Sequence, residues 1–122
     1  MLATQTGRPI ALVLEDEPLI SMDVEQTLES AGFDVVAVGT CADAHSFLDR
    51  TTPAVAIVDI VLADGPCGHV ATRLIQANVP FVVHSGDEPG LHTDTPFAVG
   101  IWVNKPSAAS EFMAATLTAV AG

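Results

Sequence analysis

The chain has little positive charge and few aromatic side chains. Its 122 residues include only four Lys and Arg against fifteen Asp and Glu, which gives a formal net charge of -11. A surface of this sign repels the phosphates of nucleic acids and anionic lipids, so we expect no nucleic-acid partner. Aromatic residues make up only 5% of the sequence, so the core must be built from Val, Ala, Leu and Ile. That composition is typical of strands alternating with helices in an α/β domain.

The sequence also has no long apolar run and no closely spaced cysteines. No stretch approaches the ~18–20 apolar residues that a membrane span needs, and the first residues lack the apolar centre of a signal peptide. We therefore expect a cytoplasmic protein without a membrane partner, with residues 1–8 as a flexible lead-in and residues 9–122 as one domain. Cys41 and Cys67 have no CxxC spacing, and we expect both to remain reduced thiols.

Five apolar runs alternate with helix-like segments along the chain. The expected strands are Ile10–Leu14, Phe33–Val38, Ala54–Val58, Val79–Val83 and Ile101–Val103. The expected helices are Pro18–Ala31, Asp43–Arg50, His69–Ala77 and Glu111–Val120. Uninterrupted apolar strands are typical of a parallel sheet that is buried on both faces, so we predict a doubly wound α/β fold. In the last two helices we expect these side chains to face inward: Val70, Leu74, Ile75, Phe112, Met113, Leu117 and Val120.

The segment between the fourth and fifth strands departs from this alternation. Residues 86–96 contain two Pro, two Gly and hardly any apolar residue. Pro89 and Gly90 in the middle of the segment disfavour a regular helix. Two interpretations remain open, an ordinary surface loop and a mobile switch segment.

Charged residues follow three of the expected strands. Glu15 and Asp16 come after the first strand, Asp59 after the third, and Lys105 after the fifth. The carboxyl ends of parallel strands meet at one rim of the sheet, where open α/β folds bind their ligands. Carboxylates suit a hard cation such as Mg²⁺, and a lysine supplies positive charge for a phosphate oxygen. The pattern therefore predicts a site for Mg²⁺ and a phosphoryl group.

This pattern resembles the receiver domain of bacterial two-component response regulators, and the resemblance covers nearly the whole chain. It implies a flavodoxin-like, five-stranded sheet of order 2-1-3-4-5 with a fourth helix that is short or disordered. It also implies that Asp59 accepts a phosphoryl group. Asp16 would bind Mg²⁺ directly, Glu15 would bind it through a water, and the backbone carbonyl of Val61 would complete the protein ligands.

The resemblance extends to residues around the expected acceptor. Ser85 matches the residue that hydrogen-bonds a phosphoryl oxygen, and Trp102 stands where the family has its switch aromatic, usually Tyr or Phe. The Lys105–Pro106 bond is expected to be cis, an arrangement that would direct the ammonium group into the site. His84 adjoins the site, and we interpret it as structural.

Two further features concern the lifetime of the phosphorylated state and the subfamily. The family positions that orient the hydrolytic water correspond to Val61 and Asp87. Because the Val61 side chain cannot hydrogen-bond water, we expect slow self-dephosphorylation. Residues 80–81 and 85–86 are similar to the FAT GUY subset of single-domain alphaproteobacterial receivers, whereas residues 87–88 differ from it.

The function implied is that of a signalling module rather than an enzyme. Asp59 would take a phosphoryl group from a sensor histidine kinase or a phosphotransfer protein, and the domain, a monomer or weak dimer, would act through protein contacts without a DNA-binding output domain. One alternative is a small Asp-based phosphotransferase or phosphatase, although such enzymes commonly carry Asp-x-Asp after the first strand. Another is a receiver-like binding module that is not phosphorylated, against which the complete set of charged residues weighs.

Overall fold

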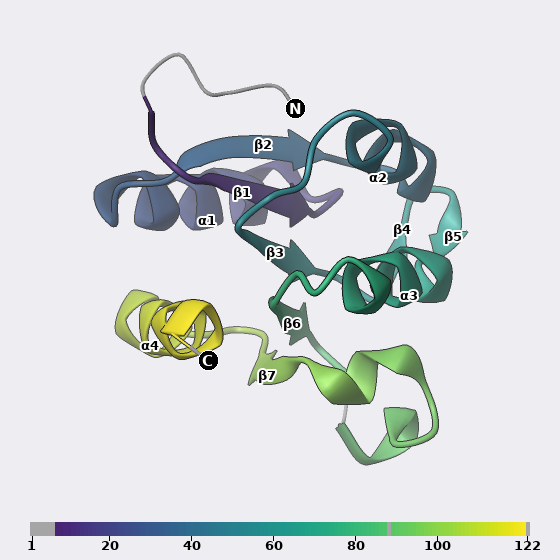
Figure 1. Cartoon of the computed structure of the whole chain (residues 1–122). Coiled ribbons are helices and arrows are strands. Elements are labelled where there is room, and N and C mark those ends of the chain that lie inside the picture. Colours follow the sequence, from purple (N-terminus) through teal and green to yellow (C-terminus); the bar gives the residue numbers. More distant parts are fainter. Residues whose placement is uncertain (1–6, 88, 122) are drawn as a thin grey trace.

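The structure is a computed structural model that describes residues 7–87 and 89–121 (Figure 1). The expected lead-in, residues 1–8, therefore lies mostly outside the described residues. The strands are β1 (Ile10–Leu14), β2 (Asp34–Val38), β3 (Val55–Val58), β4 (Val61–Leu62), β5 (Gly65–Pro66), β6 (Phe81–Ser85) and β7 (Ile101–Asn104). The α-helices are α1 (Pro18–Ser30), α2 (Cys41–Leu48), α3 (Gly68–Gln76) and α4 (Ala109–Ala121). Among the described residues, no helix has both the length and the apolar character that a membrane span requires.

The main sheet has five strands in the order β2-β1-β3-β6-β7, and every neighbouring pair is parallel. The two short strands β4 and β5 form a separate antiparallel hairpin. When the five main-sheet strands are counted along the chain without the two hairpin strands, β6 is the fourth and β7 the fifth, so their order is the predicted 2-1-3-4-5. The predicted flavodoxin-like fold is confirmed.

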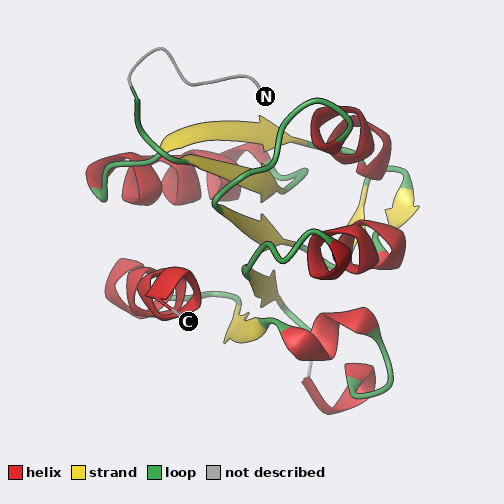
Figure 2. Cartoon of the chain, in the orientation of Figure 1, coloured by secondary structure: helices red, strands yellow, loops and turns green. Residues whose placement is uncertain are grey.

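Helices cover both faces of this sheet, with α1 and α4 on one face and α2 and α3 on the other (Figures 1 and 2). The alternation of side chains along β1 divides the core accordingly. Leu12 and Leu14 belong to the cluster packed under α2 and α3, whereas Ala11 and Val13 belong to the cluster packed under α1 and α4. All four side chains are fully buried, which explains why β1 has no polar residue before its carboxyl end.

The inward faces of the last two α-helices differ in part from those predicted. Val70, Leu74 and Phe112 are buried, but Ile75, Leu117 and Val120 are 37%, 52% and 43% exposed. The prediction for these three residues was wrong, because α3 turns Ala71 rather than Ile75 toward the core, and α4 turns Thr116 and Ala119 toward it rather than Leu117 and Val120. The Thr116 hydroxyl donates a hydrogen bond to the carbonyl of Phe112 at 3.0 Å, so its burial leaves no polar group unpaired.

The connection between β6 and β7 contains two short 3-10 helices, η1 (Pro89–His92) and η2 (Pro96–Val99), and no α-helix among its described residues. This agrees with the predicted short fourth helix. Phe97 fixes η2 to the core, and Gly100 then brings the chain against Phe81. A Cβ atom at Gly100 would lie 2.6 Å from the Phe81 ring, so this approach to β7 requires glycine. The mobility of the segment stays a prediction.

The expectation of two reduced thiols was wrong. Cys41, the first residue of α2, and Cys67, directly before α3, form a disulfide with a Cα–Cα distance of 5.6 Å. The two residues are 26 positions apart in the sequence. Local spacing could not predict this pairing, because it arises where two crossover connections meet at the same rim of the sheet.

Candidate functional site

The end of β1 places two carboxylates at the rim of the sheet. Glu15 follows the last residue of the strand, and its backbone N–H donates to the carbonyl of Val38 in β2 at 3.0 Å. This bond extends the sheet ladder by one residue and directs the Glu15 side chain inward, where it is 5% exposed. Asp16 leaves the ladder and is exposed. Pro18 then begins α1, where a missing N–H costs nothing.

Asp59 occupies the corresponding place at the end of β3, next to β1 in the sheet. Its backbone N–H donates to the carbonyl of Leu14 at 3.2 Å, which fixes it beside Glu15. Its Oδ1 accepts a hydrogen bond from the N–H of Ile60 at 2.8 Å. One carboxylate oxygen from each of Glu15, Asp16 and Asp59 lies within 4.8 Å of the other two. The fold thus brings Asp59 next to two acidic residues that lie more than forty positions earlier in the sequence.

Lys105 lies between two of these carboxylates. Its Nζ donates to Glu15 Oε1 at 2.6 Å and to Asp59 Oδ2 at 2.9 Å. Burial alone would lower the pKa of Lys105, but the hydrogen bonds and negative charges of Glu15 and Asp59 outweigh burial and raise the pKa above its ordinary value. The Lys105–Pro106 peptide bond is cis, as expected from the sequence. The lysine is therefore a fixed positive charge beside the acidic cluster.

The donor atoms of this cluster fit a hard divalent cation. Mg²⁺ takes oxygen ligands, and one or two carboxylates with several waters are its usual protein environment. Asp16 is exposed to water and Asp59 is partly so, whereas Glu15 is engaged by Lys105. Asp16 and Asp59 are thus the better placed direct ligands, and Glu15 is better placed to act through water.

Ser85 and Trp102 lie on β6 and β7, and their contacts are with the β6–β7 connection. The Ser85 hydroxyl accepts a hydrogen bond from the N–H of Asp87 at 3.1 Å, and its side chain is buried. The Asp87 carboxylate is 3.1 Å from His92 Nε2, and the His92 ring stacks on Trp102 with a centroid distance of 5.6 Å. Ser85 and Trp102 are therefore joined through Asp87 and His92, a connection that the sequence did not reveal.

Val61 begins the β4–β5 hairpin two residues after Asp59. Its side chain is 52% exposed, so it presents an apolar surface to solvent beside the carboxylates. The hairpin was missed because two-residue strands leave no periodic signal.

His84 is a buried polar residue directly before Ser85 on β6. Its Nε2 is 3.1 Å from the Ser107 hydroxyl, its ring lies against Phe112 in α4, and its Nδ1 has no partner among the described residues. Burial and the nearby charge of Lys105 lower the pKa of His84 to about 4, although Asp59 opposes the shift. The histidine is therefore neutral near pH 7, and it connects β6 to the residues that follow Lys105.

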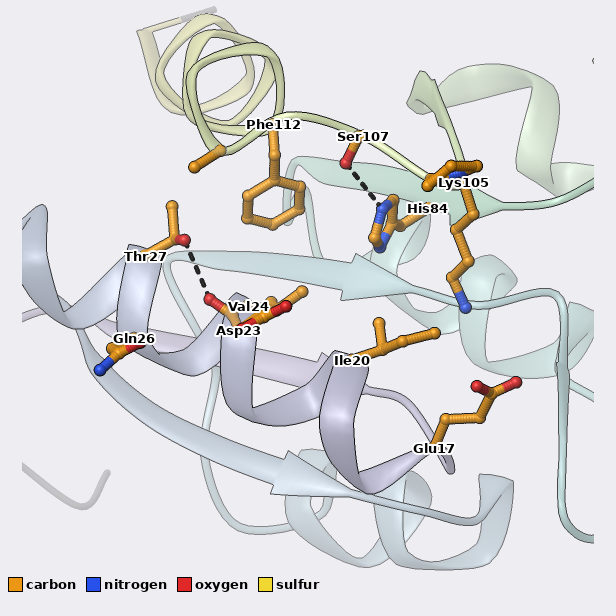
Figure 3. Close-up of a pocket in the computed structure, with 12 residues that line it drawn as sticks. Glu17, Ile20, Asp23, Val24, Gln26, Thr27, His84, Lys105, Ser107 and Phe112 are labelled. Atoms are coloured by element: carbon orange, nitrogen blue, oxygen red, sulfur yellow. Dashed lines mark hydrogen bonds between the residues drawn. The ribbon is translucent and has the colours of Figure 1, made fainter.

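A groove of about 680 Å³ lies between α1 and α4, and its lining includes Lys105, which contacts the acidic cluster (Figure 3). Ile20, Val24 and Phe112 give it an apolar floor, and the Lys105 ammonium lies at one end. On the outer side of α1, Leu19 and Met22 are 78% and 62% exposed. The site thus opens beside an apolar surface.

Comparison with known proteins gives the same fold at high coverage. A response regulator receiver protein from Sinorhizobium medicae superposes with a TM-score of 0.86 and 26% identity, over 97% of this chain and 98% of that one. A sensor protein from Polaromonas sp. superposes with a TM-score of 0.81 and 26% identity, over 93% and 97%. The chain therefore has the fold of response regulator receiver domains and is similar to them in sequence.

Two further comparisons bear on the receiver domain. The phyllosphere-induced regulator PhyR of Methylorubrum extorquens is 37% identical over 76 residues, which are 55% of this chain but only 28% of PhyR. The receiver domain of a Pseudomonas aeruginosa sensor histidine kinase, whose structure has a magnesium ion coordinated in its active site cleft, superposes with a TM-score of 0.78 at 21% identity, over 94% and 99% of the two chains. No protein-family model matches the chain.

Proposed function

We propose that this receiver domain, residues 9–122, accepts a phosphoryl group on Asp59 in a Mg²⁺-dependent reaction. The observation that supports this most strongly is the position of the Asp59 carboxylate, which is partly exposed, hydrogen-bonded to Lys105 and within a cluster of three carboxylates. Receiver domains in general are signalling modules that take phosphoryl groups from histidine kinases or phosphotransfer proteins. A cytoplasmic location follows from that partner class.

In the proposed reaction, a carboxylate oxygen of Asp59 attacks the phosphorus of a phosphohistidine in line with the bond that breaks. A new O–P bond forms, and the N–P electron pair returns to the donor imidazole, which takes a proton from water. Mg²⁺ bound by Asp16, Asp59 and the Val61 carbonyl, with Glu15 acting through a water, would neutralise charge on the phosphoryl oxygens.

The other groups at the rim would stabilise the product. Lys105 transfers its hydrogen bond from Asp59 Oδ2 to a phosphoryl oxygen, which keeps its positive charge beside the added negative charge. Ser85 exchanges its contact with the Asp87 N–H for a hydrogen bond to another phosphoryl oxygen. Because Asp87 is joined to His92 and thereby to Trp102, this exchange would alter the β6–β7 connection and the Trp102 environment.

The decisive experiment is incubation of the protein with acetyl phosphate and Mg²⁺, followed by intact-mass measurement. One phosphoryl group should be added to the wild type and to Asp94→Asn, which changes an exposed aspartate outside the loop that follows Asp59. Asp59→Asn should not be labelled. Labelling of the Asp59→Asn protein, or of a different residue in the wild type, would overturn the assignment.

The groove and the exposed side chains of α1 support docking of a protein donor next to Asp59. Leu19→Ser should slow transfer from a phosphorylated histidine phosphotransfer protein and leave labelling by acetyl phosphate unchanged. Leu91→Ser, which alters a 72% exposed leucine on the β6–β7 connection, is the matched control. Equal transfer rates for the wild type and both variants would place the donor elsewhere.

The apolar residue at position 61 supports a long-lived phosphorylated state. Val61→Asn adds a side chain that can orient water next to Asp59, so loss of the phosphoryl group should become faster. A timed decay of phosphorylated protein after removal of acetyl phosphate measures this rate. Equal decay of wild type and variant would show that residue 61 does not limit access of water.

A further inference from the structure

The Cys41–Cys67 disulfide joins the start of α2 to the loop that contains Asp59. We define this acceptor loop as residues 59–67, from the end of β3 to the residue before α3. Its last residue is Cys67, so one half of the disulfide belongs to the same loop as Asp59. The other half, Cys41, is in a different crossover connection of the sheet.

Noncovalent contacts join the same two segments at the same place. The Asp64 carboxylate accepts hydrogen bonds from the N–H groups of Cys41 at 2.7 Å and Ala42 at 3.1 Å. The Ala63 N–H donates to the carbonyl of Gly39 at 3.4 Å, which is a long bond. The attachment of the acceptor loop to α2 therefore has one covalent link and a small number of exposed or weak hydrogen bonds. Exposed hydrogen bonds of this kind contribute little by themselves. Ile60 and Leu62 pack the loop into the core under α2 and α3, and the disulfide adds the covalent link between the loop and the start of α2.

The two cysteines differ in their exposure to solvent. Cys67 is 1% exposed, whereas Cys41 is only partly buried. Cys41 is therefore the half of the disulfide at which a thiolate from solvent would attack, and Cys67 is the half whose sulfur would leave.

We propose that Cys41–Cys67 is a thiol–disulfide exchange site for a dithiol reductant, and that its reduction loosens the acceptor loop. A thiolate of the dithiol attacks Cys41 Sγ, forming a mixed disulfide while Cys67 leaves with the bonding electron pair and takes a proton. The second thiol of the reductant attacks its own sulfur of the mixed disulfide and releases Cys41, which is also protonated. Two electrons and two protons pass to the protein, and the reductant becomes a disulfide.

The regulatory part of this proposal rests on the proposed function. A protein that receives a phosphoryl group in the cytoplasm meets dithiols that keep most protein thiols reduced. A disulfide beside the acceptor then changes with the redox state of the cell rather than serving as a permanent crosslink. Oxidised protein keeps the Val61 carbonyl and Asp59 in position, and reduced protein holds them less firmly and is phosphorylated more slowly.

The first test follows the exchange itself and does not depend on phosphorylation. The protein is oxidised and then titrated with dithiothreitol under native conditions, and its thiols are counted by maleimide labelling and intact mass. Two thiols should appear together while the far-ultraviolet circular dichroism stays native. The melting temperature should fall by about 10 °C, as expected for opening a closed loop of this size. Amide hydrogen exchange should rise in residues 59–67 and at the start of α2 more than in β1.

The second test measures phosphorylation by acetyl phosphate in both redox states. We expect the initial rate to be about tenfold lower in the reduced protein, since a small misplacement of a reacting group has effects of this size. Cys41→Ser should be phosphorylated at the rate of the reduced wild type under both oxidising and reducing conditions. Cys67→Ala is a second variant that removes the other half of the disulfide and should give the same result. His45→Gln, which alters α2 but leaves the disulfide intact, should respond to reduction as the wild type does.

Three results would overturn the proposal. Thiols that do not pair under oxidising conditions, or a disulfide that dithiothreitol opens only when the protein unfolds, would exclude an exchange site. Unchanged hydrogen exchange of residues 59–67 after reduction would exclude control of the loop. If Asp59 is not phosphorylated in either redox state, the proposed function fails, but thiol titration and hydrogen exchange still decide whether the exchange site exists.

Discussion

The two sides of the Asp59 carboxylate are built on different interactions. On one side, Lys105 connects Glu15 and Asp59 through two short ion pairs, and His84 connects β6 to the residues after Lys105. On the other side, the acceptor loop is joined to α2 by a disulfide and by the exposed Asp64 carboxylate. We call these the charged side and the covalent side.

This difference indicates that the two sides respond to different changes. The charged side balances three carboxylates against one ammonium group, so it responds to a bound cation, to a phosphoryl group and to pH. The covalent side contains no buried charge, and it responds to reduction. The following predictions test that separation, from the largest expected effect to the smallest.

Removing the ammonium group should have the largest effect. Lys105→Met leaves the buried Glu15 carboxylate without its partner, which should lower the free energy of unfolding by about 2–4 kcal/mol without Mg²⁺. Millimolar Mg²⁺ should restore part of this loss. Urea unfolding of the wild type, Lys105→Met and the exposed control Arg50→Met measures the effect. A loss of stability no greater than that of the control would mean that Lys105 does not stabilise the buried Glu15 carboxylate.

Adding a divalent cation should stabilise the charged side by mass action. Millimolar Mg²⁺ should raise the melting temperature of the wild type by roughly 5 °C, and much less in Asp16→Ala. Glu29→Ala, which removes an exposed carboxylate from α1, should keep the wild-type response. The same shift in Asp16→Ala as in wild type would show that the cation binds elsewhere.

Acid should destabilise the charged side through His84. The folded-state pKa of about 4 lies below the unfolded value of about 6.5, so only the unfolded chain gains a proton between these values. The neutral histidine therefore contributes stability that is complete above pH 6.5 and is lost as the pH falls toward 4. His84→Gln should lose about 2 kcal/mol less than the wild type between pH 7 and pH 4.5. Parallel stability curves from urea unfolding at each pH would contradict this assignment.

The smallest effect should come from Asp64 on the covalent side. Its pKa is lowered by hydrogen bonds from the N–H groups of Cys41 and Ala42, so its contribution is present above the ordinary pKa and is lost as the pH falls through the lowered value. Asp64→Asn should cause a small loss of stability near pH 7, larger in reduced than in oxidised protein. An effect of equal size in both redox states would show that the carboxylate and the disulfide do not act on the same contact.

Much of the charged side was predictable from the sequence. Glu15, Asp16, Asp59 and Lys105 each follow an apolar run, and parallel strands place such residues at one rim whatever the details of packing. The fold and strand order followed from the same runs and from the receiver resemblance. The inward faces of the helices were less predictable. Thr116 rather than Leu117 is buried in the core, because its hydroxyl donates a hydrogen bond to the carbonyl of Phe112 in the same helix.

The sequence by itself determined the alternating strands and helices and the charged residues at the strand ends, because these depend on local apolar patterns and on the geometry of any parallel sheet. Only the tertiary structure decided the Cys41–Cys67 pairing, the Asp64 contacts with α2, and the link from Ser85 through Asp87 and His92 to Trp102. These contacts join separate connections of the sheet or depend on the path of an irregular segment. Their geometry is set by how the segments pack in three dimensions, and no local pattern in the sequence records it.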